Sequence, residues 1–301
     1  MNHHNHGHVH AHSSPQDAPL MAIAGALTIT ATVFFAELAG GIISGSVALL
    51  ADAMHMLSDA AGLIVALAAV LVGKRAANSR ATYGYRRVEV LAALVNAATV
   101  LAVSVWIAVE AIGRLRTPEP IETGPMMIVA AIGLVANALS AWMLRAQQGD
   151  SINVRGAYLH VLVDMLGSVA VLVAGAIVAT TGFTAADPIA SLLIAAMVFP
   201  RAWALMTESA GVMLERVPDG FDARVVETQL RGVDGVADLH DLHLWSLDGV
   251  SVIATVHIVA GEGRDRNQLL DRVQTELKEL GAGHATVQIE PPEHIDHETV
   301  C

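Results

Sequence analysis

Residues Val154–Thr180 read VRGAYLHVLVDMLGSVAVLVAGAIVAT. A helix that crosses the hydrocarbon core of a bilayer needs about 20 predominantly apolar residues. After Arg155, the acidic and basic side chains in this stretch are Asp164 and His160. The stretch therefore predicts a membrane-spanning helix that carries an imidazole and a carboxylate four positions apart.

Five other stretches are of similar length and apolar character. They are Leu20–Ile43, Val47–Val72, Val88–Ile112, Pro125–Leu144 and Ala185–Met206. The whole chain is 54% hydrophobic and only 15% charged, whereas soluble domains carry about 25% charged residues. The sequence thus predicts an integral, multi-pass α-helical membrane protein with six transmembrane helices. Its expected partners therefore include the lipid bilayer.

The basic residues of the short loops predict the orientation of these spans. The loops after the second and fourth spans, together with the start of the fifth span, hold Lys74, Arg75, Arg80, Arg86, Arg87, Arg145 and Arg155. The other three loops hold only Arg114 and Arg116. Because Lys and Arg are enriched in cytoplasmic loops, we expect both termini in the cytoplasm. The lack of a targeting segment and the short loops favour a bacterial inner membrane.

The chain changes character after Pro218, where a small soluble domain is expected. Helices are predicted at Asp222–Arg231 and Arg264–Leu280, and strands at Val236–Leu247, Val250–Ala260 and His284–Glu290. This αββαβ order is typical of a ferredoxin-like or metallochaperone-like α+β domain with one open sheet face. From Gly211 onward the chain has 17 acidic and 7 basic residues, which argues against a nucleic-acid partner.

The predicted domain organisation has four parts. Residues 1–19 form a His-rich cytoplasmic tail and residues 20–208 the transmembrane domain. Residues 209–295 form the cytoplasmic metal-binding α+β domain, and residues 296–301 a C-terminal tail. In the first tail, histidines stand at His3, His4, His6, His8, His10 and His12. Such a tract is either a solvated tail or a metal-collecting arm.

The H-x-x-x-D pair of the fifth span has a twin in the second, where His55 and Asp59 have the same spacing. Positions i and i+4 share one helix face. Both pairs fall near the middle of the bilayer on antiparallel helices, so His55, Asp59, His160 and Asp164 can close a four-ligand shell. A single pair of this kind can simply join helices by hydrogen bonds. Two copies are harder to explain so, because each ionisable side chain at a helix centre costs about 2.5–3.5 kcal/mol.

A divalent cation would compensate that cost. Four nitrogen and oxygen ligands in a tetrahedral array suit Zn²⁺, while Mg²⁺ and Ca²⁺ prefer six or more oxygens. Ligand softness does not separate Zn²⁺ from Co²⁺ or Cd²⁺. The one cysteine, Cys301, excludes a zinc cluster built from cysteines within the chain.

Asp52 and Glu37 are further acidic residues within the spans. Asp52 stands three residues before His55 and can share its face, as a carboxylate of the outer vestibule or a hydrogen-bond partner. Glu37 lies toward the outer end of the first span, where it can meet water. For both, a supporting role is the preferred interpretation.

A second metal cluster is expected on the soluble domain. Asp248-Gly249 is typical of a two-residue hairpin turn, which makes Leu247 face Val250 and places His240 opposite His257. The opposite sheet face, with Val252, Ala254, Val256 and Ile258, is then the buried one.

The last strand adds polar side chains to this prediction. In His284–Glu290 the polar positions are His284, Gln288 and Glu290. If they join the open face, His240, His257 and Glu290 form a metal cluster. In this register His243 falls on the other face, so it ranks lower as a ligand.

Four motifs carry a resemblance to a known family. ELAGGIISGSVALLADAMHMLSDA, TYGYRRVEVLAALVNA, HVLVDMLGSVAV and HDLHLW together resemble the cation diffusion facilitator family, and the match covers nearly the whole chain. The resemblance implies a homodimeric antiporter of metal ions and protons, with the transport site at His55, Asp59, His160 and Asp164. H-x-x-x-D on both helices is similar to the zinc branch, which often also passes cadmium or cobalt.

The resemblance also bears on regulation. Family members bind regulatory Zn²⁺ on the cytoplasmic domain near the dimer interface, and Gln288 stands where some relatives have His. Relatives with an extra metal site in the loop after the second span use Asp and His there. Residues Lys74–Arg87 contain neither, so that site is not expected.

The expected function is proton-coupled efflux of divalent metal by alternating access, and not catalysis. One alternative is a membrane metalloenzyme, which would need an open coordination position for water; no H-E-x-x-H motif occurs. The other alternative is a membrane-anchored zinc sensor, which predicts no flux and no need for ligands inside the membrane.

Overall fold

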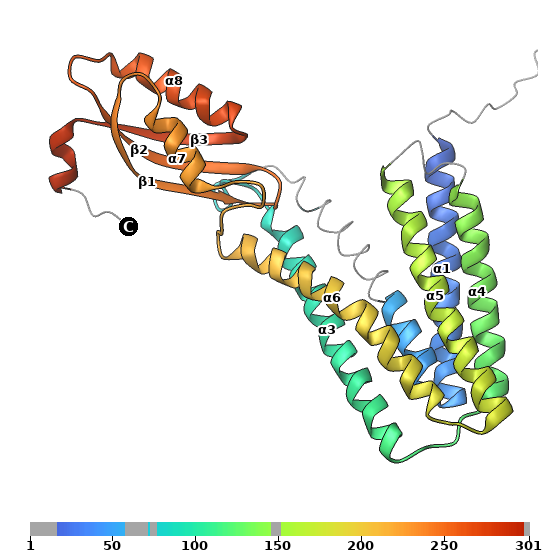
Figure 1. Cartoon of the computed structure of the whole chain (residues 1–301). Helices are drawn as coiled ribbons and strands as arrows, with labels where there is room; N and C mark the ends of the chain where they lie inside the picture. Colours follow the sequence, from blue (N-terminus) through green and yellow to red (C-terminus); the bar gives the residue numbers. More distant parts are fainter. Residues whose placement is uncertain (1–16, 58–71, 73–76, 146–151, 298–301) are drawn as a thin grey trace, which may run out of the picture. The chain divides into compact units, whose positions relative to one another are not determined.

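The computed structural model describes the backbone of residues 17–57, 72, 77–145 and 152–297, and most of their side chains (Figure 1). The chain divides into two compact units, residues 1–61 with 99–201 and residues 62–98 with 202–301. The long helices α3 (Arg87–Arg116) and α6 (Ala186–Met213) contribute to both units.

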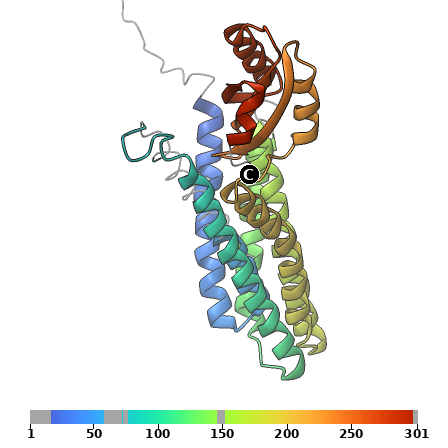
Figure 2. The same ribbon diagram turned by 90° about the vertical axis from the view of Figure 1, so that its left-hand side faces the viewer.

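Helices make up the first unit. Besides parts of α3 and α6, it contains α1 (Asp17–Ser44), the helical segment Val47–Leu57, α4 (Thr123–Arg145) and α5 (Ile152–Thr181). Helix α4 packs along both α1 and α5, and the three run side by side in both views (Figures 1 and 2).

Several of these helices are long and apolar enough to cross a membrane. In the described part of the chain they are α3, α4, α6 and the stretch Val161–Thr181 of α5. Shorter apolar helices cover Thr28–Ser44 and Val47–Leu57. Four of the predicted spans are thus confirmed as membrane-length helices. The first is helical as α1, and the second is helical as far as Leu57, beyond which the predicted span leaves the described residues.

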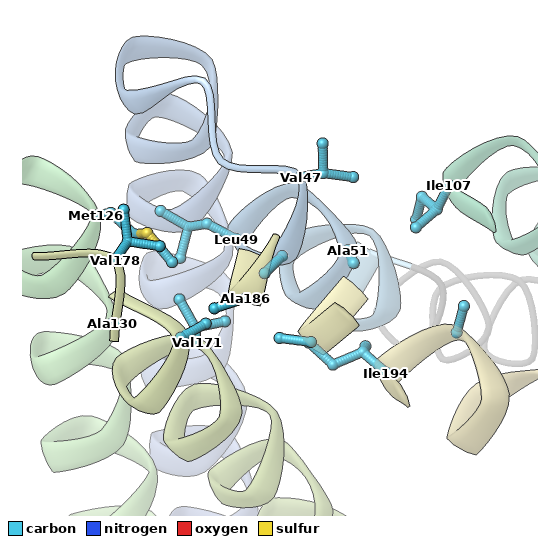
Figure 3. Packing of buried hydrophobic residues seen from close by; sticks show 14 residues of the cluster. Val47, Leu49, Ala51, Ile107, Met126, Ala130, Val171, Val178, Ala186 and Ile194 are labelled. Carbon is cyan, nitrogen blue, oxygen red and sulfur yellow. The ribbon is translucent and has the colours of Figure 1, made fainter. Parts of the chain in front are cut away.

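The core of this unit forms where five helices meet. Val47, Leu49 and Ala51 pack with side chains of α3, α4, α5 and α6 (Figure 3). Close approach depends on glycine: a Cβ atom added to Gly40 would lie 2.8 Å from Val129 Cγ2. The start of the second helix is therefore held firmly among its neighbours.

The second unit contains the α+β domain. Its elements are α7 (Ala223–Arg231), β1 (Val236–Ser246), β2 (Val252–Ala260), α8 (Arg266–Glu279), β3 (Ala282–Glu290) and the short 3-10 helix η1 (Pro292–His297). Asp222 and Asp265 cap α7 and α8 by accepting hydrogen bonds from backbone N–H groups of the first turn. The αββαβ prediction is confirmed.

The sheet has the order β1-β2-β3, with β1 and β2 antiparallel and β2 and β3 parallel. Both helices cover one face. Leu230 of α7 and Val273 of α8 pack with Ala254, Val256 and Ile258 of β2, as the alternation predicted. The other face carries the histidines.

The register of the β1–β2 hairpin differs from the prediction in three places, one of which, between Val236 and Asp238, lies beyond the histidines. The other two lie between the histidines and the turn. The ladder begins at Ser246 and Val252, so the turn is longer than two residues and Leu247 does not pair with Val250. A β-bulge then lies between His240 and His243. These two departures shift the register in opposite senses, so His240 pairs with His257 as predicted. His243 pairs with Thr255 and lies on the open face, contrary to the prediction.

Candidate metal centres

The structure brings together two of the four side chains predicted for the membrane site. His55 of the segment Val47–Leu57 and Asp164 of α5 are 8% and 1% exposed, and His55 Nε2 lies 3.7 Å from Asp164 Oδ1. Asp59 lies outside the described residues. The same holds for the side chain of His160, which stands one helical turn before Asp164 in α5. A buried imidazole and carboxylate from two apolar helices thus face each other.

His55 opens onto a cavity of about 250 Å³, which Asp52 also lines. Asp52 is buried and accepts a hydrogen bond from Ser168 Oγ at 3.4 Å. Its carboxylate lies where a side chain on Gly167 would be, so only glycine fits there. Arg201 of α6 lines the same cavity. Asp52 is therefore placed beside His55 and supported from α5, in keeping with a supporting role.

Glu37 is not where the sequence placed it. Instead of meeting water, its side chain is fully buried. A Cβ atom on Gly133 of α4 would lie 2.5 Å from Glu37 Oε1 and 3.3 Å from Ser168 Oγ. Within the residues whose side chains are described, neither carboxylate oxygen of Glu37 has a hydrogen-bond partner. The error arose because position along the span was taken to indicate exposure, while glycines in facing helices allow a buried carboxylate there.

The soluble domain holds the second cluster. Glu290, only 2% exposed, lies between two histidines: Oε2 is 3.1 Å from His240 Nε2, and Oε1 is 3.0 Å from His257 Nδ1. The imidazole rings are 5.1 Å apart, nearly perpendicular. Gln288 Nε2 donates to Glu290 Oε1 at 2.7 Å. The three residues predicted for this cluster therefore lie together, with Gln288 beside them.

Asp241 belongs to this cluster although the sequence prediction omitted it. One ligand atom from each of His240, Asp241 and His257 lies within 4.8 Å of the others. In a regular strand Asp241 would face away from its neighbour His240. The bulge changes this, because Asp241 adopts a φ of 47°, a conformation that Asp tolerates better than most residues. The adjacency of His and Asp in HDLH was the available signal.

The remaining predicted residues lie elsewhere. His243 is exposed on the open face. His284 is exposed, and its ring meets that of Tyr83 edge-on at 6.2 Å. The tail histidines His3, His4, His6, His8, His10 and His12 lie outside the described residues.

The apolar helices and the α+β domain define a multi-pass membrane protein with a C-terminal soluble domain. Comparison with known proteins specifies it further. Residues 23–214 match the cation efflux transmembrane domain, and residues 218–292 match the cytoplasmic domain of cation efflux proteins. The chain belongs to the cation efflux family, whose members are transporters and not enzymes.

Three relatives illustrate the similarity. The metal cation efflux system protein CzcD of Cupriavidus metallidurans is 41% identical over 88% of this chain and 84% of its own length. The zinc transporter ZitB of Escherichia coli is 40% identical over 92% and 89%. The cadmium, cobalt and zinc/H(+)-K(+) antiporter of Bacillus subtilis is 36% identical over 86% and 85%.

Proposed function

We propose that this protein exports Zn²⁺, and also Cd²⁺ or Co²⁺, across a bacterial inner membrane in exchange for protons. The observation that carries the proposal is the buried pair His55–Asp164, contributed by two apolar helices and opening onto a cavity. The names of the relatives, which include zinc, cadmium and cobalt transporters, support the metals. The proton as counter-ion is supported by the name of the Bacillus subtilis relative.

In this mechanism the metal is the cargo of the four-ligand site His55, Asp59, His160 and Asp164. Histidine and carboxylate bind Zn²⁺ only when deprotonated, so loading from the cytoplasm displaces protons. After the site opens outward, protons replace the metal and favour the return. Asp52, held by Ser168 in the same cavity, orients the ligands or passes protons to them.

The cytoplasmic cluster is proposed to bind regulatory Zn²⁺ through His240, His257 and Glu290, with Asp241 as a further ligand. Gln288 would hold the carboxylate of Glu290 in place. We also propose that the protein is a homodimer. The match of residues 218–292 to the cytoplasmic dimerisation domain of cation efflux proteins supports this. We further propose that the domain bounds are those predicted from the sequence and that both termini are cytoplasmic. The His-rich tail is proposed to collect metal ions.

Purified protein reconstituted in liposomes tests the transport function. Wild-type protein should take up Zn²⁺ into the liposomes only when a pH gradient drives protons in the opposite direction. Asp164→Asn should lower the rate by at least about tenfold, because a neutral amide is a poor Zn²⁺ ligand. Asp271→Asn, the same change on the exposed surface of α8, should transport like wild type.

The alternatives give different results in this assay. Zinc binding without flux in the wild-type protein would favour a sensor, and zinc-dependent hydrolysis without flux a metalloenzyme. Full transport by Asp164→Asn would reject the assigned site.

A further inference from the structure

A groove of about 930 Å³ lies in the second unit, between the segment that leads into α3 and strand β1. One wall consists of consecutive residues from Arg80 to Val88, and the other includes Leu242 to Trp245. Glu215 and Val217, just after α6, also line the groove. Neither metal centre includes any of these residues.

Three arginines give the groove its charge. Arg87 pairs with Glu215, its Nη2 atom lying 2.6 Å from Oε1. Arg86 Nη1 is 3.4 Å from Asp248 Oδ2. Arg80 has no ion-pair partner among the residues that the structure describes. Three guanidinium groups against two carboxylates leave one positive charge in excess.

The pair of Arg86 with Asp248 is the weaker of the two. The Asp248 carboxylate already accepts hydrogen bonds from Ser251 N at 2.7 Å, Val250 N at 3.0 Å and Ser251 Oγ at 3.0 Å. More than half of the Arg86 side chain is exposed. Its guanidinium can therefore turn toward an anion in the groove, because the Asp248 carboxylate would keep its other hydrogen bonds.

The groove lies where two candidate spans end. Helix α3 begins at Arg87, and Glu215 follows closely on the end of α6 at Met213. The β1–β2 turn is next to the same end, because a Cβ atom on Gly249 would lie 3.8 Å from Val212 Cγ2. Lipid headgroups occupy the level at which spans leave the hydrocarbon.

The surroundings suit a lipid surface. Leu214 and Val250 are 75% and 85% exposed, an unusual exposure for branched apolar side chains on a soluble domain. Tyr83, Tyr85 and Trp245 line the groove, and such aromatic residues are enriched at membrane–water interfaces. A lipid can contact these apolar side chains with its acyl chains while its headgroup contacts the arginines, whereas a free anion would contact only the arginines.

We propose that this groove binds the phosphate of an acidic phospholipid headgroup, with Arg80 and Arg86 as its principal contacts. The planar guanidinium presents paired N–H donors that match phosphate oxygens. One phosphodiester charge neutralises the single excess positive charge. The bound lipid would join the segment before α3 to strand β1 at the membrane surface.

Binding to the full-length protein in detergent tests this inference independently of transport. The probes are short-chain phosphatidylglycerol, short-chain phosphatidylcholine and inorganic phosphate, with dissociation constants measured by calorimetry. Arg80→Gln should weaken phosphatidylglycerol binding by about tenfold, the loss expected for a hydrogen bond between charged groups. Arg80→Gln combined with Arg86→Gln should weaken it further, and Arg80→Lys should retain part of the affinity.

The matched control is Arg145→Gln, which removes an exposed arginine at the end of α4 and should bind like wild type. Equal weakening by this control would show unspecific attraction and overturn the proposal. Wild-type affinity in the double variant, or equally tight binding of phosphatidylcholine, would overturn it too. Inorganic phosphate that binds as tightly as phosphatidylglycerol would identify a free-anion site instead. Thermal unfolding of each variant confirms that it is folded.

Discussion

Glu290 is the residue on which the cytoplasmic cluster depends. Its carboxylate contacts one histidine from each of the other two strands, β1 and β2, and is almost completely buried. A buried carboxylate is costly unless it is paired with a cation or well hydrogen-bonded. A metal ion shared by His240 and His257 would meet this need, and Asp241 would supply a further oxygen from the edge of the cluster.

Asp241→Asn is therefore expected to weaken Zn²⁺ binding at the cytoplasmic cluster by about tenfold, because a charged ligand becomes a neutral amide. The measurement is competition with a chromophoric chelator in full-length protein carrying Asp164→Asn, so that the membrane site contributes little. Asp271→Asn serves as the control. An unchanged affinity would remove Asp241 from the ligand set.

Single residues show what the sequence predicted about the sites. The H-x-x-x-D spacing singled out His55 and Asp164, each within its own helix, because that rule depends only on a regular helix. Alternation placed His257 and Glu290 on the open face, and His240 lies opposite His257 because the longer turn and the bulge shift the register in opposite senses. The full burial of Glu37 and the orientation of Asp241 depend on Gly133 in a facing helix and on a local bulge. Such tertiary features have no signature in a periodic pattern.

At the scale of elements, the second helix is capped by a residue from α6. Asp187 accepts hydrogen bonds from Ser46 Oγ at 2.5 Å, Val47 N at 2.9 Å and Ala48 N at 3.3 Å. The carboxylate is fully buried. An anion at a helix N-terminus satisfies free N–H groups and interacts favourably with the helix dipole. The cap fixes the start of the helix that carries His55.

Asp187→Asn should lower the stability of the protein by about 1 to 2 kcal/mol, since the amide accepts fewer hydrogen bonds and carries no charge. Thermal unfolding in detergent measures the change, and Asp187→Glu, which keeps the charge but displaces it, should fall between the two. If Asp187→Asn unfolds at the wild-type temperature, the cap does not contribute to stability.

The β1–β2 turn is organised by Asp248 in a similar way. Burial acts to raise the pKa of Asp248, but hydrogen bonds from Ser251 and Val250 together outweigh it, and the pKa lies below its ordinary value. A carboxyl group whose pKa is lower in the folded than in the unfolded state stabilises the fold when ionised. That stability is present above about pH 4, the unfolded value, and is lost as the pH falls through the folded pKa.

Hydrogen exchange of the Val250 and Ser251 amides should report this acid sensitivity. After correction for intrinsic rates, their protection should fall as the pH drops below about 4 in the wild-type protein. In Asp248→Asn it should be low and independent of pH over that range. The Val256 amide in the core of the sheet serves as the reference, and a pH-dependent protection that survives in Asp248→Asn would contradict the prediction.

Among the elements, the two α-helices and three strands of the soluble domain were predicted close to their observed bounds, whereas the 3-10 helix η1 was not predicted. Strong alternation made the strands recognisable. The turn was predicted too short because Asp248-Gly249 is the usual signal for a two-residue connection. Here Asp248 instead bonds to residues further along, which enlarges the turn.

For the whole molecule, the distribution of basic residues predicts a cytoplasmic C-terminus. A native cysteine near that end allows the prediction to be tested by chemical labelling. Cys301 is the single cysteine of the sequence. In spheroplasts a membrane-impermeant maleimide should leave it unlabelled, and in inverted vesicles it should react. The loop residue Glu119, replaced by cysteine in a Cys301→Ser background, should give the opposite pattern. Labelling of Cys301 in intact spheroplasts would reverse the proposed topology.

The one extra residue at the bulge in β1 determines which side chains lie on the open face of the sheet. Residues three apart on a regular strand point to opposite sides, but the extra residue lets His240 and His243 face the same way. Deleting Leu242 would give a regular ladder from Asp238 to Ser246, in which His240 still opposes His257. Asp241 would then turn toward the side covered by α7 and α8. A one-residue deletion could thus remove the carboxylate from the cluster while every ligand remained in the sequence.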